Sequence, residues 1–309
     1  MKQLLFNLGR AAGVYALTNR LTRRSLRVLC YHGLWVTPGY EFGDRLFIPP
    51  RLFDRRMKRL SASGRPVLPL GEALARLQDG SLPSGAAAIT IDDGWAATPI
   101  MADTLARYGL PATLYMTTWY MERQAPIPNK TLEFLTSAAA TAVEPPSDLN
   151  SRSAEEQERA LLAYSEAVGV PLDWYHRRQF HLMTPAELEE VRAKGLDIQL
   201  HTHRHKLGED VVTELADNRD ALVRAGVPGN SLSHFCFPSG ILREDVRGAL
   251  EKFGVVSATT CESGLTTPET DPYNIPRFLD GRSVSDAEFD GFLSGFVPLM
   301  DDARARLRG

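Results

Sequence analysis

Two groups of polar residues in this chain have the types and spacing that metal-assisted or acid–base chemistry requires. The first is Asp92-Asp93-Gly94, which follows directly after an apolar run at residues 86–91. Small and β-branched residues bounded by a turn signal indicate a buried strand, and α/β proteins carry their chemistry at the C-terminal ends of such strands. Because adjacent carboxylates repel unless a cation or proton lies between them, we expect one to bind a metal and the other to move protons. The alternative is an ordinary turn without a function.

The second group is the histidine-rich stretch His201-Thr-His-Arg-His205, which follows an expected strand at residues 196–200. Side chains four residues apart share one face of a helical turn, so we expect His201 and His205 to reach one point while His203 points elsewhere. Two imidazoles and one carboxylate suit zinc and leave room for water or substrate. The alternative is a polar loop whose histidines only titrate. Three of the chain's seven histidines lie within these five residues, which favours the metal site.

The elements that position these groups alternate between strands and helices along the chain. Apolar runs predict about seven strands, at residues 27–32, 86–93, 111–118, 196–200, 233–237, 255–260 and 273–279. Strand–helix–strand order implies a parallel sheet, so we expect an α/β fold with an open or distorted β/α barrel. Residues 119–183 lack a strand signal and are expected to form a helical insertion over one end of the sheet. Residues 286–308 are expected to close the chain as one helix.

Composition and charge limit the classes of partner. The 309 residues are 43% hydrophobic, with a net charge of -3 and a pI near 6.2, so no global charge favours nucleic acid. The three cysteines, Cys30, Cys236 and Cys261, are widely spaced and odd in number. This pattern argues against a disulfide framework and suits a reducing compartment.

The N-terminal segment, residues 1–26, is basic and has the apolar spacing of an amphipathic helix, so we separate it from a barrel at 27–309. No Asp or Glu occurs between Met1 and Tyr40. We expect this helix to pack on the domain; the alternative is that residues 1–24 lie on an anionic membrane surface. Asn7 and Arg10 interrupt the apolar stretch that a secretory signal needs, and no run approaches the length of a membrane span. We therefore expect a cytoplasmic protein, with peripheral contact to the inner face of the membrane under the alternative.

Together the two motifs resemble those of the polysaccharide deacetylase family, whose members remove N-acetyl groups from chitin, peptidoglycan or poly-N-acetylglucosamine. The matching stretches are Thr90-Ile-Asp-Asp-Gly94, His201-Thr-His-Arg-His205 and Phe235-Cys-Phe-Pro-Ser-Gly240. The resemblance covers roughly residues 28–279 and implies a distorted (β/α)7 barrel. It also implies that Asp92 is the catalytic base and that Asp93, His201 and His205 bind one divalent metal ion. Zn²⁺ is favoured for that ion over Co²⁺, Ni²⁺ or Fe²⁺.

Two departures from the family pattern concern the other catalytic groups. Relatives often take their general acid from a histidine near the C-terminus, but no histidine follows His234 here. The stretch Leu29-Cys-Tyr-His-Gly33 resembles the first-strand Tyr-His motif of bacterial biofilm deacetylases, so we expect His32 to be the general acid. The alternative is a core histidine at a strand end. Many relatives also carry an arginine that orients the base, but Cys236 stands at that position. Arg277, which ends another predicted strand, is the candidate replacement, with a surface arginine as the alternative.

The resemblance further implies a groove for a sugar. We expect Trp95 to stack on a sugar face and Pro238 and Gly240 to line the groove, and we group Arg277 with them as substrate-binding residues. For Trp95 the alternative is packing beneath the loop.

The expected activity is that of a metal-dependent hydrolase that removes an N-acetyl or N-acyl group from an amino sugar. Its substrate would be a polysaccharide, an oligosaccharide or a glycolipid precursor. One alternative is a non-haem metal oxygenase, because two histidines and a carboxylate also form the facial triad of those enzymes. Another is a non-catalytic carbohydrate-binding protein with the same fold.

Overall fold

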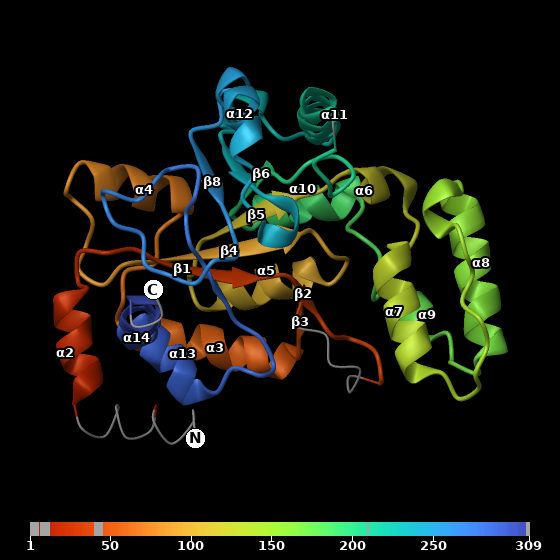
Figure 1. The fold of residues 1–309 in the computed structure, drawn as a ribbon, viewed down its shortest axis with the longest axis horizontal. Coiled ribbons are helices and arrows are strands. Elements are labelled where there is room, and N and C mark those ends of the chain that lie inside the picture. The colour runs from red at the N-terminus through yellow and green to blue at the C-terminus, as the bar shows by residue number, and fades with distance from the viewer. Residues whose placement is uncertain (1–5, 7–12, 40–45, 209, 307–309) are drawn as a thin grey trace.

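The computed structural model describes residue 6 and residues 13–39, 46–208 and 210–306. Its centre is a seven-stranded parallel sheet with the order β8-β7-β6-β5-β4-β1-β9 (Figure 1). The strands are β1 (Arg27–Tyr31), β4 (Ala87–Asp93), β5 (Ala112–Met116), β6 (Leu196–Leu200), β7 (His234–Cys236), β8 (Ser257–Thr259) and β9 (Phe278–Leu279). The sheet curls into a distorted (β/α)7 barrel, which confirms the predicted fold class.

The strands are buried because helices cover the outer side of the sheet. Every residue of β1, β4 and β5 is buried, which explains why their sequences are continuous apolar runs instead of alternating patterns. The outer helices are α3 (Pro50–Ala62), α4 (Leu70–Gln78), α5 (Thr98–Arg107), α10 (Pro185–Ala193), α11 (Val211–Arg224) and α12 (Arg247–Lys252). Several start where the sequence predicts, and α10 begins with a capping box in which Thr184 and Glu187 exchange hydrogen bonds.

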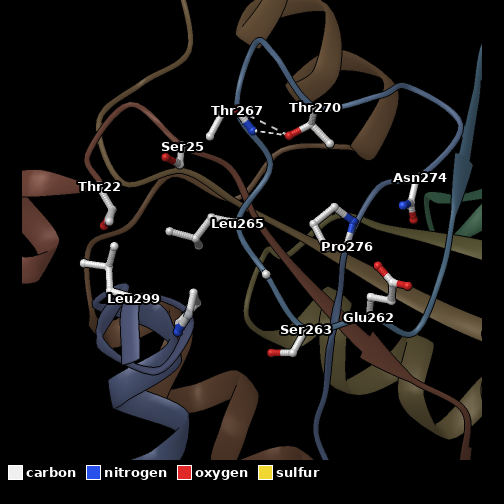
Figure 2. A pocket seen from close by; sticks show the side chains of 12 residues that line it. Thr22, Ser25, Glu262, Ser263, Leu265, Thr267, Thr270, Asn274, Pro276 and Leu299 are labelled. Carbon is white, nitrogen blue, oxygen red and sulfur yellow. Dashed lines mark hydrogen bonds between the residues drawn. The ribbon is translucent and has the colours of Figure 1, made fainter. Parts of the chain in front are cut away.

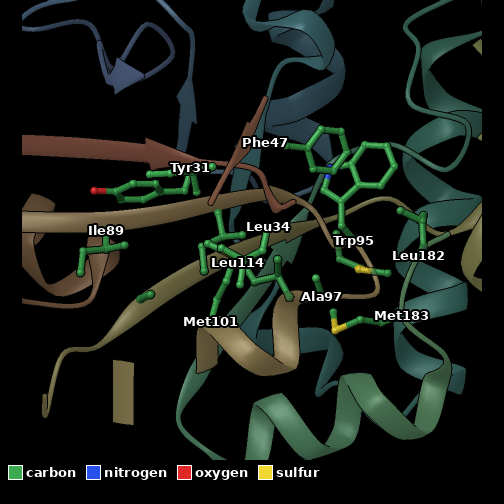
Figure 3. Packing of buried hydrophobic residues seen from close by; sticks show 14 of the residues in the cluster. Tyr31, Leu34, Phe47, Ile89, Trp95, Ala97, Met101, Leu114, Leu182 and Met183 are labelled. Carbon is green, nitrogen blue, oxygen red and sulfur yellow. The ribbon is translucent and has the colours of Figure 1, made fainter. Parts of the chain in front are cut away.

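An aromatic cluster closes the barrel beneath the loop that follows β4 (Figure 3). A short parallel pair, β2 (Gly33–Leu34) with β3 (Phe47–Ile48), places the ring of Phe47 4.9 Å from that of Trp95. Position 33 must be glycine, because a Cβ atom there would lie 2.6 Å from the Phe47 ring. The cluster therefore fixes the backbone directly after β1 and directly after β4.

Between β5 and β6, the described residues form helices and loops. The helices that precede α10 are α6 (Trp119–Arg123), α7 (Pro128–Ala138), η2 (Leu149–Ser151), α8 (Ala154–Ala167) and α9 (Asp173–His176). This segment projects from the sheet on the side where β1 and β4 end (Figure 1). Its last residues are bound to the loop after β4, because Ala96 donates its N–H to the His181 carbonyl and Met183 to that of Gly94.

The two chain ends pack together at the opposite side of the barrel (Figure 1). Helix α2 (Val14–Leu21) contacts α13 (Asp286–Leu293) and α14 (Phe296–Arg306); residues 1–5 and 7–12 of the predicted N-terminal helix lie outside the described residues. The prediction of one helix over 286–308 is wrong. Gly295 adopts a left-handed conformation with φ 81°, and a side chain there would collide with Thr22. Among the helices described, none combines the length and apolarity needed to cross a bilayer.

The segment between β8 and β9 closes the barrel without forming a full strand. The prediction placed a strand over 273–279, but only Phe278–Leu279 pairs with β1, because the N–H of Ile275 donates to Ala258 and that of Arg277 to Glu262. Ile275 instead forms a single bridge to Thr259 of β8. A surface pocket of about 350 Å³ lies between this segment and the chain ends, with Leu265 and Leu299 among its lining (Figure 2).

Candidate active site

Three predicted metal ligands from two distant strands meet at one point. Asp93 ends β4, and its Oδ1 lies 3.2 Å from Nε2 of His201 and 3.2 Å from Nε2 of His205. The carboxylate of Asp93 and the His201 ring are buried, whereas the side chain of His205 is 39% exposed. One side of this cluster therefore faces solvent, which is the open arrangement typical of a catalytic metal site.

The local geometry that joins the two histidines differs from the expected helical turn. Residues 201–205 form an irregular bend in which Thr202 has φ 63° and His205 has φ 54°. Asp93 also lies in the left-handed region, with φ 72°. Such conformations are unfavourable for residues other than glycine and cluster where a functional constraint holds them. The convergence thus depends on strained backbone at both motifs.

Hydrogen bonds to neighbouring groups orient the ligands. Nδ1–H of His201 donates to the carbonyl oxygen of Cys236 at 2.8 Å. The lone pair of Nε2 therefore points to Asp93. The His201 backbone N–H donates to Oδ1 of Asn218 at 3.0 Å. Nε1–H of Trp95 donates to Oδ2 of Asp93 at 2.8 Å, leaving Oδ1 for a cation. A carboxylate and two imidazoles, of which Asp93 and His201 each have a second hydrogen-bond partner, fit a divalent metal ion.

His203 points away from this cluster, and the residues that hold it were not foreseen from the sequence. Its Nδ1 lies 2.8 Å from Oγ1 of Thr118, and its carbonyl accepts hydrogen bonds from the N–H groups of Thr118 and Trp119. Asn218 of α11 donates to Oγ1 of Thr118 as well. The polar Thr117-Thr118 pair directly after β5 was a strand-end signal that pointed here, but no local pattern marked Asn218.

Asp92 forms a second, separate centre with Arg277. The guanidinium donates Nη1 to Oδ1 at 2.7 Å and Nη2 to Oδ2 at 2.8 Å, and it also donates to Oγ1 of Thr90 at 3.0 Å. Arg277 is fully buried, so it contacts the aspartate and not the surface. Burial raises the pKa of Asp92, but the opposing charge of Arg277 outweighs it and lowers this pKa to about 2. Asp92 is therefore a carboxylate near neutral pH.

His32 lies on the other side of Asp92. Its Nε2 is 3.7 Å from Oδ2 of Asp92, and the side chain is nearly buried. Nδ1 of His32 is buried and has no hydrogen-bond partner among the described protein atoms. Buried ring nitrogens normally have partners, so a purely structural histidine would be expected to satisfy this atom. His32 therefore lies beside Asp92 with one buried ring nitrogen that no described protein group satisfies.

The residues expected to line a sugar groove occupy different positions. Trp95 is 2% exposed, and its ring packs on Phe47, so it has no free face for a sugar and instead supports Asp93 (Figure 3). Pro238 is buried, and Gly240 is partly exposed in the turn after β7, with φ 65°. A Cβ at Gly240 would lie 2.4 Å from Cys261, so this turn depends on glycine.

The sequence around the site is similar to that of known proteins. Residues 79–258, which include Asp92, Asp93, His201 and His205, match the sequence profile described as polysaccharide deacetylase. The poly-beta-1,6-N-acetyl-D-glucosamine N-deacetylase of Staphylococcus epidermidis is 26% identical over 128 residues. That alignment covers 36% of this chain and 44% of the relative, so the chain spans less than half of the length of this curated protein.

Solved structures share the fold at low sequence identity. The Streptococcus pyogenes deacetylase PplD, solved in complex with acetate, superposes with a TM-score of 0.62 at 17% identity, covering 87% of this chain and 98% of that one. IcaB from Ammonifex degensii gives a TM-score of 0.58 at 16% identity, covering 87% and 97%.

Proposed function

The chain belongs to the polysaccharide deacetylase family, and we propose that it is a metal-dependent hydrolase that removes N-acetyl groups from amino sugars in a glycan. One observation carries this proposal. Asp93, His201 and His205 form a ligand set that is open on one side, and Asp92, which is not part of that set, is held ionised beside it. Binding of a metal alone would not require the second carboxylate.

The proposed roles follow from the positions of the side chains. A divalent cation on Asp93, His201 and His205, for which we propose Zn²⁺, would polarise the acetyl carbonyl and acidify water. Asp92 accepts the proton of the attacking water, because Arg277 keeps it ionised and fixes the direction of both oxygens. Arg277 thus acts as a positioning residue.

His32 is the proposed general acid. The amide nitrogen must gain a proton before the amine leaves, and His32 lies against Asp92 with one ring nitrogen unpaired. The name of the Staphylococcus epidermidis relative indicates activity on poly-N-acetylglucosamine, so we propose a polymer or oligomer of N-acetylated hexosamine as the substrate. A glycolipid that carries the same sugar is the second substrate class to test.

The decisive experiment measures acetate release from N-acetylated glycans and glycolipids, with and without a chelator. Asp92→Asn should abolish release while metal content stays unchanged, because Asp92 is not a ligand. His32→Ala should lower kcat by roughly 100-fold or more with metal retained. Sugar binding without acetate release at saturating Zn²⁺ would instead support a carbohydrate-binding protein. Bound iron with dioxygen uptake would support an oxygenase.

We also propose that helix α2 contacts an anionic membrane surface, which would place the protein at the inner face of the membrane. Leu17 is 58% and Leu21 69% exposed, and Arg20, Arg23 and Arg24 lie exposed beside them. Within the described residues, no carboxylate forms an ion pair with these arginines. Exposed leucines among unpaired arginines suit the interface of anionic lipids.

Vesicle sedimentation tests this contact. The protein should bind vesicles that contain phosphatidylglycerol and not vesicles of phosphatidylcholine alone. Replacing Arg20, Arg23 and Arg24 by glutamine should remove binding, whereas replacing the distant surface pair Arg152 and Arg159 of the insertion should not. Equal binding by both variants would contradict the proposal.

A further inference from the structure

The three cysteines, which are far apart in the sequence, surround the Asp92–Arg277 pair. Sγ of Cys30 lies 3.7 Å and Sγ of Cys236 3.5 Å from Oδ2 of Asp92. Nη2 of Arg277 lies 3.2 Å from Sγ of Cys236 and 3.6 Å from Sγ of Cys261. The strands β1 and β7 and the segment after β8 each contribute one thiol. All three are free thiols.

Cys261 differs from the other two thiols in its access to solvent. Cys30 and Cys236 are fully buried, whereas Cys261 is partly exposed at the start of the segment that joins β8 to β9. Its Sγ lies 3.6 Å from Nη2 of Arg277, and the Cys30 thiol lies close enough to influence its pKa. The cluster therefore has one accessible sulfur with a second sulfur directly behind it.

The surroundings also make Cys261 the most nucleophilic of the three. The hydrogen bond from Cys30 and the charge of Arg277 outweigh burial and lower the pKa of Cys261 to about 6. Burial raises the pKa of Cys30 well above its ordinary value, so Cys30 remains a protonated donor. Cys261 is therefore the thiol that reacts first with an electrophile, because the thiolate is the nucleophilic form of cysteine.

We propose that Cys261 is a peroxide-sensitive modification site and that its oxidation closes a disulfide with Cys30 next to the catalytic aspartate. The Cys261 thiolate attacks one oxygen of hydrogen peroxide, and the O–O bond breaks to give Cys261 sulfenic acid and hydroxide. The Cys30 sulfur then attacks the sulfenic sulfur, and its S–H proton and the hydroxyl leave as water. The two cysteines are oxidised by two electrons in total, and the peroxide is reduced to one water and one hydroxide, which becomes a second water on taking up the proton that Cys261 released when it ionised.

The disulfide would alter the site through β1. Cys30 lies in β1 and His32 directly follows its last residue, and the side chains of both approach Oδ2 of Asp92. Oxidation removes the thiol hydrogen that Cys30 can donate to Asp92 and links β1 across the barrel to the segment after β8. We expect acetate release to fall roughly 10- to 100-fold in the oxidised form, because small displacements of catalytic groups lower the rate by that much. This expectation rests on the proposed function.

The test treats the full-length, zinc-loaded protein with hydrogen peroxide, blocks the remaining thiols, and maps the peptides by mass spectrometry. The expected product is a Cys30–Cys261 cross-link that a phosphine reductant removes. Activity should fall as the cross-link forms and return on reduction, whereas damage by methionine oxidation would persist. The peptide map decides the site of modification even if no acetate release is found, so failure of the proposed function remains distinguishable.

Matched variants separate the three thiols, each compared with its own untreated form. Cys261→Ser should form no cross-link and keep its activity under peroxide. Cys236→Ser, which removes an inaccessible thiol from the same cluster, should still form the Cys30–Cys261 cross-link. The inference is overturned if the cross-link joins Cys236 instead, if Cys261 goes directly to sulfinic acid, or if Cys261→Ser loses activity as fast as the parent.

Discussion

Replacing Arg277 by methionine tests how the catalytic carboxylate is held. Methionine fills a similar volume but removes the charge and the paired hydrogen bonds to Asp92. The pair is fully buried, with distances of 2.7 and 2.8 Å, so no water can substitute for the guanidinium. The variant therefore leaves a buried carboxylate without its partner.

The expected loss of unfolding free energy in Arg277→Met follows from the pKa of Asp92. The difference between a pKa of about 2 and the ordinary value of about 3.9, at about 1.4 kcal/mol per pH unit, corresponds to about 2 to 3 kcal/mol. Loss of one partner of a buried ion pair commonly costs about 3 to 5 kcal/mol, because the remaining charge keeps its desolvation penalty. We expect Arg277→Met to lower the free energy of unfolding by an amount in this range.

A double-mutant cycle measures the interaction energy between Arg277 and Asp92. Arg277→Met, Asp92→Asn and the double variant are unfolded in urea, with chelator present so that metal binding does not contribute. The double variant should be more stable than the sum of the two single effects predicts, by about 2 kcal/mol or more. In the metal-loaded protein, Arg277→Met should lower kcat by roughly 100-fold, with KM and metal content little changed.

The pH dependence of the unfolding free energy is a second test of the Asp92–Arg277 pair. In the parent, the lowered pKa of Asp92 contributes stability that is complete above about pH 4 and is lost as the pH falls through about 2. In Arg277→Met, only His32 and His201 remain to oppose burial, so the pKa of Asp92 rises. The free-energy cost of its buried charge is then full at neutral pH and is relieved as the pH falls. The gap in stability between the parent and Arg277→Met should therefore narrow from pH 7 towards pH 4.

Additive effects in the cycle, or a gap that does not change with pH, would refute the assignment of Arg277 as the partner that keeps Asp92 ionised. Normal kcat in Arg277→Met would refute its positioning role in the reaction.

Three further predictions concern the metal site. Trp95→Phe keeps the aromatic packing but removes the hydrogen bond to Asp93, so Zn²⁺ affinity measured by chelator competition should fall roughly 10-fold or more; unchanged affinity would contradict the role of the indole. Asn218→Ala removes the acceptor of the His201 N–H, and its unfolding free energy should fall by about 1 to 3 kcal/mol in urea titrations. Chelation should lower Tm and Zn²⁺ should restore it in the parent but not in Asp93→Asn, since binding to the folded state stabilises it; a Tm that ignores metal would remove the basis for the site.

Local sequence was sufficient for most of the barrel strands and for the two motifs, but not for the last strand or the C-terminal helix. Continuous apolar runs marked buried strands, and β6 lies at residues 196–200 as expected. The change from an apolar run to polar residues marks the edge of the core. For this reason the motif residues could be placed at strand ends. The C-terminal helix was placed as one unit because a glycine inside an apolar pattern does not reveal its backbone conformation; Gly295 divides it.

The details of the site depend on contacts between residues distant in the chain. His201 and His205 converge through a strained bend, and not through the helical turn that their spacing indicated. Hydrogen bonds of this bend with Thr117, just after β5, and with Asn218 of α11 stabilise it. The position of Trp95 beneath the ligand likewise depends on Phe47, which local spacing could not place.

From the sequence alone, residue chemistry and periodicity determined the α/β barrel and the acidic and histidine motifs at β4 and after β6. Only the tertiary structure decided which partner ionises Asp92, since Arg277 is 185 residues away and reaches it through the closure of β9 against β1. The same closure gathers three widely spaced cysteines around that pair. The physical reason is that side-chain distances across a barrel are set by strand order and register, which short-range patterns do not encode.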